Sequence, residues 1–260
     1  MRIEVKDLRF SYGGAEVLHG LSFAAGQGDV VAVLGPNGVG KSTLFRCLLG
    51  FLRPRSGQIL LDGKNIRSMD HQELARQIAY IPQSAAPAFN YTVLDSVLMG
   101  MTSQIGVFSS PTAAHREKAM EALESLGIAH LANRGCGRIS GGEKQMMLLA
   151  RALVQDAKIL IMDEPTASLD YGNSFRVMRR IETLGEAGYT VIFSTHEPNQ
   201  AFRYASRVLA LRDGRLLADG RPAEVLHEET LSTLYGIGVA VRCAEVDGMQ
   251  YSISIPKGEK

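Results

Sequence analysis

The feature that most constrains this chain is a glycine-rich segment at residues 35–42, GPNGVGKS, which directly follows five apolar residues. Such a short run without alternation is typical of a strand buried on both faces of a parallel sheet. Residues 41–49 have helical character and end at Gly50. The segment therefore has the sequence and the predicted context of a P-loop, in which backbone N–H groups at a helix start surround phosphate oxygens.

The strand–loop–helix context favours a nucleoside triphosphate as the ligand. Glycines allow the backbone to approach the phosphates, and the helix N-terminus adds a favourable dipole. We expect Lys41 to reach the β- and γ-phosphates and Ser42 to ligate Mg²⁺. The alternative interpretation is a glycine turn that only caps a helix.

A second apolar run, residues 159–162, ends in Asp163 and Glu164. On its own, an acidic pair after such a run would more often be a solvated strand end. This pair follows the P-loop by about 120 residues, and a triphosphate site needs an acid on the metal side and a group that activates water. We therefore expect Asp163 to hold Mg²⁺ through water and Glu164 to act as the general base.

The rest of the chain predicts an α/β fold. Further apolar runs at residues 191–193 and 208–211 alternate with helical stretches, one of them at residues 171–184 with a cap at Asp170, so the sheet should be parallel. The first 30 residues instead predict antiparallel strands, in which Ile3, Val5, Leu8 and Phe10 are among the apolar positions.

Two regions depart from the alternation of strands and helices. Residues 84–155 predict a helical insertion, with residues 101–114 as a loop between two of its helices. After Arg221 the sequence predicts one helix, from Pro222 to Leu226 or longer, and then two strands around the hairpin dipeptide Asp247-Gly248.

Composition excludes several classes of protein. The 260 residues carry a formal net charge of +1, which argues against a dedicated nucleic-acid coat, and we expect no nucleic-acid partner. The three cysteines, Cys47, Cys136 and Cys243, lie far apart and favour a reducing compartment. Neither a signal peptide nor an apolar stretch long enough for a membrane helix is evident, so a cytosolic location is expected.

Three further motifs accompany the P-loop and the acidic pair. These are SGGE at residues 140–143, SLD at residues 168–170, and His196. The SGGE segment alone would be a capping box, with Ser140 at the N-cap and Glu143 three residues later. Together, the five motifs resemble the ATP-binding cassette of ABC transporters, over about residues 2–220.

The resemblance implies a P-loop NTPase fold, with a RecA-like parallel sheet core, an N-terminal antiparallel β subdomain and an inserted α-helical subdomain. We expect one domain over residues 1–260. Within it, the ATP-binding core comprises about residues 1–83 and 156–220. The helical subdomain with the signature motif comprises about residues 84–155, and residues 221–260 form a short C-terminal extension.

The resemblance also implies a cassette dimer, because in this family the signature segment, here residues 140–143, binds the γ-phosphate held by the other subunit's P-loop. It further implies roles for individual residues. The implied catalytic residues are Glu164, His196 and Lys41, and the implied Mg²⁺ ligands are Ser42, Gln83 and Asp163. The implied ATP contacts are Tyr12, Gly35, Pro36, Asn37, Gly38, Val39, Gly40, Lys41, Ser42, Thr43 and Gln83, with Ser140, Gly141, Gly142, Glu143 and Asp170 acting in trans.

A cassette without membrane helices must bind separate membrane subunits, as in bacterial importers. The sequence resembles the branch that imports iron chelates, haem and vitamin B12, through residues 80–83, 93–100, 148–153 and 234–236. This implies a homodimer at the cytoplasmic face of the inner membrane, bound to two permease subunits and acting with a substrate-binding protein. Oxyanion importers for molybdate or tungstate, a non-transport ABC ATPase and a nucleotide kinase remain as alternatives.

An apolar loop, residues 85–91, follows Gln83 directly. Exposed apolar segments of this kind often mark a binding surface. We therefore expect a surface that includes Phe89, Tyr91 and Val93 to receive a short helix from a membrane subunit. The alternative is that Phe89 and Tyr91 only pack the helical insertion onto the core.

Overall fold

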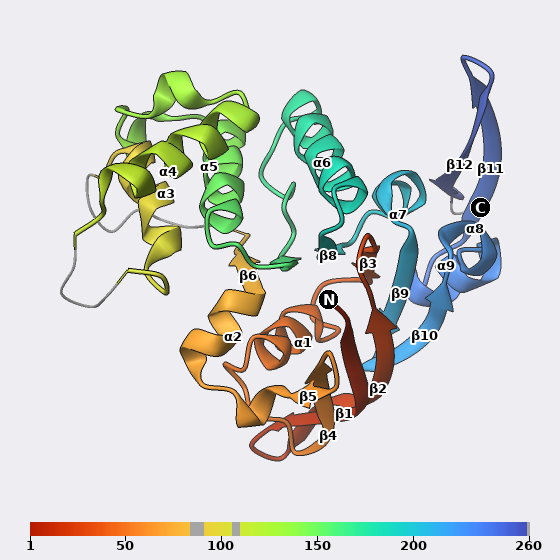
Figure 1. Ribbon diagram of the computed structural model, residues 1–260. Helices are drawn as coiled ribbons and strands as arrows, with labels where there is room; N and C mark the ends of the chain where they lie inside the picture. Colours follow the sequence, from red (N-terminus) through yellow and green to blue (C-terminus); the bar gives the residue numbers. More distant parts are fainter. Residues whose placement is uncertain (84–90, 106–109, 259–260) are drawn as a thin grey trace. The chain divides into compact units, whose positions relative to one another are not determined.

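The computed structural model describes residues 1–83, 91–105 and 110–258 (Figure 1). The chain divides into two compact units, which are considered one at a time. Unit 1 comprises Met1–Met69 and Met178–Lys260, and unit 2 comprises Asp70–Val177. The expected division at residues 84, 156 and 221 follows subdomains of the family and stays a prediction.

Unit 1 begins with an antiparallel sheet, as the alternating apolar residues predicted. Its strands are β1 (Ile3–Tyr12), β2 (Ala15–Ala25), β4 (Ser56–Leu61) and β5 (Lys64–Asn65), in the order β2-β1-β4-β5. Ile3, Val5, Leu8 and Phe10 are all buried, which explains why this register is stable. The short 3₁₀ helix Ile66–Ser68 follows β5.

The parallel strands of unit 1 are β3 (Val30–Leu34), β8 (Thr190–Thr195) and β9 (Arg207–Arg212), and β3 lies between the other two. Every residue of β3 is buried, which confirms the interpretation of its unalternating apolar run. Strand β10 (Arg215–Gly220) pairs antiparallel with β9. Helix α1 (Lys41–Leu48) follows β3, and helix α7 (Pro198–Tyr204) follows β8.

The C-terminal part of unit 1 differs from the prediction in one respect. Instead of one helix it contains two, α8 (Pro222–Val225) and α9 (Glu228–Tyr235), because the backbone leaves the helical region at Leu226 and His227. The predicted hairpin is confirmed as β11 (Val239–Val246) and β12 (Met249–Pro256). Its turn residues, Asp247 and Gly248, both have positive φ, at 52° and 76°, as a two-residue hairpin turn requires.

One carboxylate joins α9 to β11 and to the residue that follows β12. Glu228 accepts hydrogen bonds from Lys257 Nζ at 2.7 Å, from Arg242 Nη1 at 2.5 Å and from the Val241 N–H at 3.2 Å. The Lys257 ammonium, and next the Arg242 guanidinium, lower the pKa of Glu228 from its ordinary 4.5 to about 2. The stabilisation is therefore complete above pH 4.5 and is lost as the pH falls from 4.5 towards 2.

We expect Glu228→Gln to lower the hydrogen-exchange protection of the β11 and β12 amides about two- to fivefold at neutral pH, because an exposed ion pair contributes modestly. The wild-type hairpin should lose the same protection as the pH falls towards 2. Glu229→Gln, the same change at the neighbouring exposed position of α9, is the control. Equal protection of the hairpin in all three proteins would contradict this role of Glu228.

Unit 2 contains two parallel strands, β6 (Ile78–Ile81) and β7 (Ile159–Met162), in which Ile81 lies opposite Met162. Its helices are α2 (His71–Gln77), α3 (Val93–Leu98), α4 (Ala113–Ser125) and α5 (Gly141–Leu153), with 3₁₀ turns at Met99–Met101, Ala129–Leu131 and Cys136–Arg138. Helix α6 (Tyr171–Glu186) begins in unit 2 and continues into unit 1. The first turns of α5 and the end of β7 position the candidate site of this unit.

The expected helical insertion is confirmed as a run of helices, and α5 is buried along most of its length. The predicted loop at residues 101–114 ends earlier, because Thr112 caps α4 and its first residue is Ala113; residues 106–109 of that loop lie outside the described residues. None of the helices in the described ranges has both the length and the apolar character that crossing a bilayer requires.

Candidate functional site

The P-loop of unit 1 has the conformation that its glycines predicted. Gly38 and Gly40 have positive φ, at 85° and 107°, where other residues would be strained. A Cβ at Gly35 would lie 2.4 Å from the Leu211 carbonyl oxygen, so the strand can turn into the loop only at glycine. Helix α1 then begins at Lys41 with Gly40 at its N-cap, and no side chain caps it. The N–H groups of its first turn can therefore receive an anion.

Lys41 is folded back onto this loop. The side chain is 5% exposed, and its ammonium donates to the carbonyl oxygens of Gly35 at 2.6 Å and Pro36 at 3.1 Å. Both acceptors belong to the loop that would surround the phosphates. The ammonium is thus held beside the expected position of the β- and γ-phosphates.

His196 lies near the start of the same loop. Thr195, the last residue of β8, accepts a hydrogen bond from the Gly35 N–H at 3.3 Å, and it lies opposite Leu34 in the parallel register. His196 is the next residue and is exposed. The strand order of unit 1 therefore brings the predicted γ-phosphate contact to the P-loop.

Tyr12 ends β1, and its ring is 47% exposed. It meets Phe10 edge to face, with ring centroids 4.8 Å apart. This exposed fraction is high for a tyrosine whose only role is to pack in the hydrophobic core. Its assignment as the residue that stacks on adenine stays a prediction.

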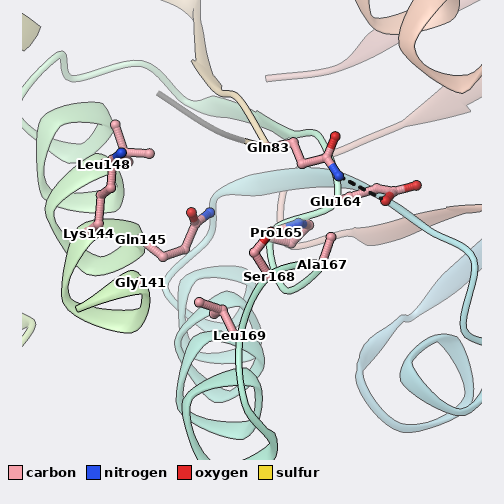
Figure 2. A pocket seen from close by; sticks show the side chains of 10 residues that line it. All are labelled: Gln83, Gly141, Lys144, Gln145, Leu148, Glu164, Pro165, Ala167, Ser168 and Leu169. Atoms are coloured by element: carbon pink, nitrogen blue, oxygen red, sulfur yellow. Dashed lines mark hydrogen bonds between the residues drawn. The ribbon is translucent and has the colours of Figure 1, made fainter. Parts of the chain in front are cut away.

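In unit 2, the pairing of β6 with β7 brings three predicted site residues to one edge. Gln83 follows β6, and Asp163 and Glu164 follow β7, so all three leave the carboxyl ends of neighbouring parallel strands. The Asp163 N–H donates to the Ile81 carbonyl at 3.0 Å, which continues the pairing one residue further. The Gln83 amide nitrogen lies 3.4 Å from a Glu164 carboxylate oxygen (Figure 2).

Glu164 has an unusual backbone. Its φ is +44°, in the left-handed region that residues with a Cβ rarely adopt. Two tight turns follow it, closed by hydrogen bonds from Ala167 to Glu164 and from Leu169 to Thr166. Backbone outliers of this kind concentrate at functional sites, so the observation supports the interpretation of Glu164 as a reacting group.

The signature segment forms the capping box that its sequence predicted. The Glu143 N–H donates to Ser140 Oγ at 3.3 Å, and the Ser140 N–H donates to the Glu143 carboxylate at 2.7 Å. The backbone hydrogen bond from Ser140 lowers the pKa of Glu143. The carboxylate is therefore held at the start of α5, where the helix dipole favours a negative charge.

Asn173, which belongs to none of the predicted motifs, links the start of α5 to α6. A Cβ at Gly142 would lie 2.5 Å from the Asn173 side chain, so Gly142 permits a close approach. Asn173 is in turn held by Asp170, whose carboxylate accepts from its N–H and its side-chain amide, both at 2.8 Å. The only sequence signal is the spacing from Asp170 to Asn173, which is that of an N-cap and its third helical residue.

A pocket of about 200 Å³ lies within unit 2 between these segments. Figure 2 shows Gln83 and Glu164 pointing towards one another, with α5 on one side and the turn after Glu164 on another. The lining residues are Gln83, Gly141, Lys144, Gln145, Leu148, Glu164, Pro165, Ala167, Ser168 and Leu169. The pocket thus brings together residues from three of the five predicted motifs or their immediate neighbours.

The donor groups fit Mg²⁺ rather than a softer metal. In unit 2, Asp163 offers a carboxylate that is 9% exposed, and Gln83 offers an amide oxygen; in unit 1, Ser42 offers a hydroxyl. Mg²⁺ prefers such oxygen ligands and completes its shell with water and substrate phosphates. Within the described ranges, no cluster of three or more His, Cys, Asp or Glu side chains could hold a metal by itself.

The predicted residues divide between the two units. Unit 1 contains Tyr12, residues 35–43 and His196, and unit 2 contains Gln83, residues 140–143, Asp163, Glu164 and Asp170. Ser140, Gly141 and Asp170 are exposed, as contacts to a second subunit would require, whereas Gly142, which was predicted to act with them, is buried.

The residues of the predicted docking surface differ in exposure, and docking itself stays a prediction. Tyr91 is 41% exposed, whereas Val93 is completely buried, so the expectation that Val93 belongs to an exposed surface was wrong. The cause is local. Thr92 caps α3, and the Val93 N–H donates to the Arg134 carbonyl, which holds Val93 against the segment around residue 134. Phe89 lies outside the described residues.

Comparisons with known proteins agree with this geometry. A sequence profile described as ABC transporter matches residues 18–167. The chain is 34% identical over 247 residues to the ferric enterobactin transport ATP-binding protein of Escherichia coli strain K12, covering 95% of this chain and 90% of that protein. It is 37% identical over 235 residues to the molybdate import ATP-binding protein of Haemophilus influenzae, covering 90% of this chain and 87% of that protein.

Among solved structures, the fold is similar to a chain of a metal-chelate type ABC transporter in an inward-facing conformation. The TM-score is 0.89 at 33% sequence identity, and the match covers 99% of this chain and 98% of that chain. The match therefore includes the C-terminal helices and hairpin, beyond the segment that the family profile covers.

Proposed function

Because the chain belongs to the ABC transporter family, in which ATP hydrolysis drives membrane transport, we propose that it powers the import of a metal chelate through separate permease subunits. The chelate would be an iron–siderophore complex, haem or a cobalamin. One observation carries the proposal: the similarity to a metal-chelate type transporter extends over nearly the whole of both chains.

In the proposed cycle, each of this chain's motifs has one task. The loop at residues 35–43 binds the phosphates, with Lys41 on the β- and γ-phosphates, and Tyr12 stacks on adenine. Glu164 orients the attacking water and accepts its proton, while His196 contacts the γ-phosphate. Ser42, Gln83 and Asp163 hold Mg²⁺, which when bound neutralises charge on the phosphates.

We further propose that two copies of the chain act together. Ser140, Gly141 and Asp170 are exposed, and Gly141 lies at the start of α5, where backbone N–H groups can donate hydrogen bonds to a phosphate. A two-fold axis would place the signature segment of each copy over the P-loop of the other, so one contact surface would be formed twice. Gly142, Glu143 and Asp170 complete the part of the site acting in trans.

The proposed partners are two integral membrane permease subunits and, indirectly, a substrate-binding protein. The cassette would act at the cytoplasmic face of the inner membrane as a peripheral subunit. Tyr91, eight residues after Gln83 in the sequence, is exposed, which supports a permease contact on unit 2. An exposed aromatic side chain is suited to bind a partner subunit.

The cargo is tested by reconstituting the cassette in proteoliposomes with a permease that copurifies with it and a binding protein that this permease accepts. We expect a ferric siderophore, haem or cobalamin to stimulate both ATP hydrolysis and uptake several-fold, whereas molybdate does neither. The control is the same complex with Glu164→Gln, which should retain cargo binding by the binding protein but give no uptake. Stimulation by molybdate alone would contradict the proposed cargo while leaving the ATPase assignment intact.

A molybdate or tungstate importer is the second candidate, and the relative named for molybdate import favours it. The cassette does not contact the cargo, so its motifs serve either transporter equally well. A non-transport ABC ATPase would fail a different test, because such a protein would not copurify with any permease.

A further inference from the structure

The C-terminal extension contacts the segment that contains His196. The Tyr235 hydroxyl, at the end of α9, donates a hydrogen bond to the His196 carbonyl oxygen at 2.8 Å. Both residues belong to unit 1, together with the P-loop. The two residues are 39 positions apart in the sequence, so this contact is a product of the fold.

The His196 carbonyl lies between two elements of secondary structure, where it accepts from the Tyr235 hydroxyl. Strand β8 ends at Thr195, and the N-cap of α7 is Glu197, so His196 belongs to neither element. Within the helix, the carbonyl that accepts from the Gln200 N–H is that of Glu197. A backbone carbonyl in such a position is normally satisfied by a side chain or water, and here the Tyr235 hydroxyl satisfies it.

Tyr235 is itself held in a defined position. Helix α9 is anchored by Leu231 and Leu234, which are 0% and 3% exposed, and it ends where Gly236 adopts a left-handed conformation, with φ of 70°. Burial, and next the negative charge of Glu197, raise the pKa of the Tyr235 phenol. The hydroxyl therefore remains a hydrogen-bond donor throughout the physiological pH range.

Two further contacts hold α7 against the hairpin. Asn199 receives hydrogen bonds from the N–H and the hydroxyl of Ser254 in β12, at 2.7 and 2.9 Å. The Arg203 guanidinium lies over the ring of Tyr251, 4.9 Å from its centroid. The chain on the C-terminal side of His196 is thus fixed at α7, while Tyr235 fixes His196 itself.

We propose that Tyr235 is a positioning residue for ATP hydrolysis, which holds the His196 backbone so that the imidazole faces the γ-phosphate. The inference rests on the proposed role of His196. Without the hydroxyl, the peptide after His196 loses one of the contacts that hold it, and a smaller fraction of molecules presents the imidazole correctly. Nucleotide binding through the P-loop should not change, because its contacts are made elsewhere in unit 1.

The first test compares Tyr235→Phe with wild type in steady-state ATP hydrolysis by the full chain. We expect kcat to fall about five- to tenfold, as for loss of one hydrogen bond, with KM for ATP unchanged within about twofold. Tyr251→Phe is the matched control, since it removes a hydroxyl from the same extension but keeps the ring against Arg203. Its kcat should equal that of wild type.

The second test is a double-mutant cycle with His196→Ala. If Tyr235 acts through His196, then Tyr235→Phe should have no further effect on kcat once the imidazole has been removed. Additive effects of the two changes, or an unchanged kcat in Tyr235→Phe alone, would overturn the inference. An inactive wild-type protein would instead overturn the proposed function. Thermal unfolding of each variant separates these outcomes from a general loss of stability.

Discussion

Glu164→Gln is expected to bind ATP normally and to hydrolyse it about 100- to 10,000-fold more slowly than wild type. The amide has nearly the shape of the carboxylate, but it cannot accept the proton of the attacking water. The contact with Gln83 is long, at 3.4 Å, and the oxygen of the new amide can still accept it. Single-turnover phosphate release, measured beside ATP binding, gives both quantities.

The matched control is Glu121→Gln, the same change at an exposed position on α4. Phosphate release by Glu164→Gln within threefold of wild type would refute the general-base assignment.

The same variant also tests for the dimer. ATP that is not hydrolysed should hold two copies of the chain together, so the closed dimer should accumulate. Sedimentation in ATP and Mg²⁺ should show a two-fold dimer, and a strictly monomeric protein at high concentration would contradict the site acting in trans.

Lys41→Ala is expected to lose ATP affinity and turnover together. The ammonium is buried beside the loop carbonyls of Gly35 and Pro36, where it can pair with phosphates in both the ground state and the transition state. We expect the Kd for ATP to rise about 10- to 100-fold, as for loss of a hydrogen bond to a charged group. The value of kcat should fall about 100-fold or more.

Lys6→Ala, which removes an exposed ammonium from β1, is the control for a change in net charge. Thermal unfolding checks that the loop variant is folded, because Lys41 also donates to backbone groups. If Lys41→Ala bound ATP as tightly as wild type, Lys41 would not be the phosphate-binding lysine.

The parts of the structure that could be predicted depend on residues close together in the sequence. The P-loop turn, the capping box at Ser140 and the hairpin turn at Asp247 each require particular residue types at fixed spacing. Buried strands such as β3 were predictable for the same reason, since their apolar runs are continuous. All of these features were confirmed.

The features that were missed depend on residues far apart in the sequence or on a local break in a helix. Tyr235 acquires its position by meeting His196, and nothing near Tyr235 in the sequence indicates that contact. The break between α8 and α9 occurs at Leu226 and His227, two residues that do not usually end a helix. The prediction for Val93 was wrong because the side chain of an apolar residue near a loop can face either the solvent or the protein interior.

The left-handed backbone at Glu164 has a consequence for the evolution and engineering of this chain. A residue with a Cβ loses about 1–2 kcal/mol in that conformation, which is a noticeable fraction of the stability of a typical domain. Selection for thermal resistance alone would favour glycine at this position, whereas selection for turnover would retain the carboxylate. Attempts to raise the melting temperature should therefore leave residue 164 fixed and look for gains elsewhere, because stability and activity conflict there.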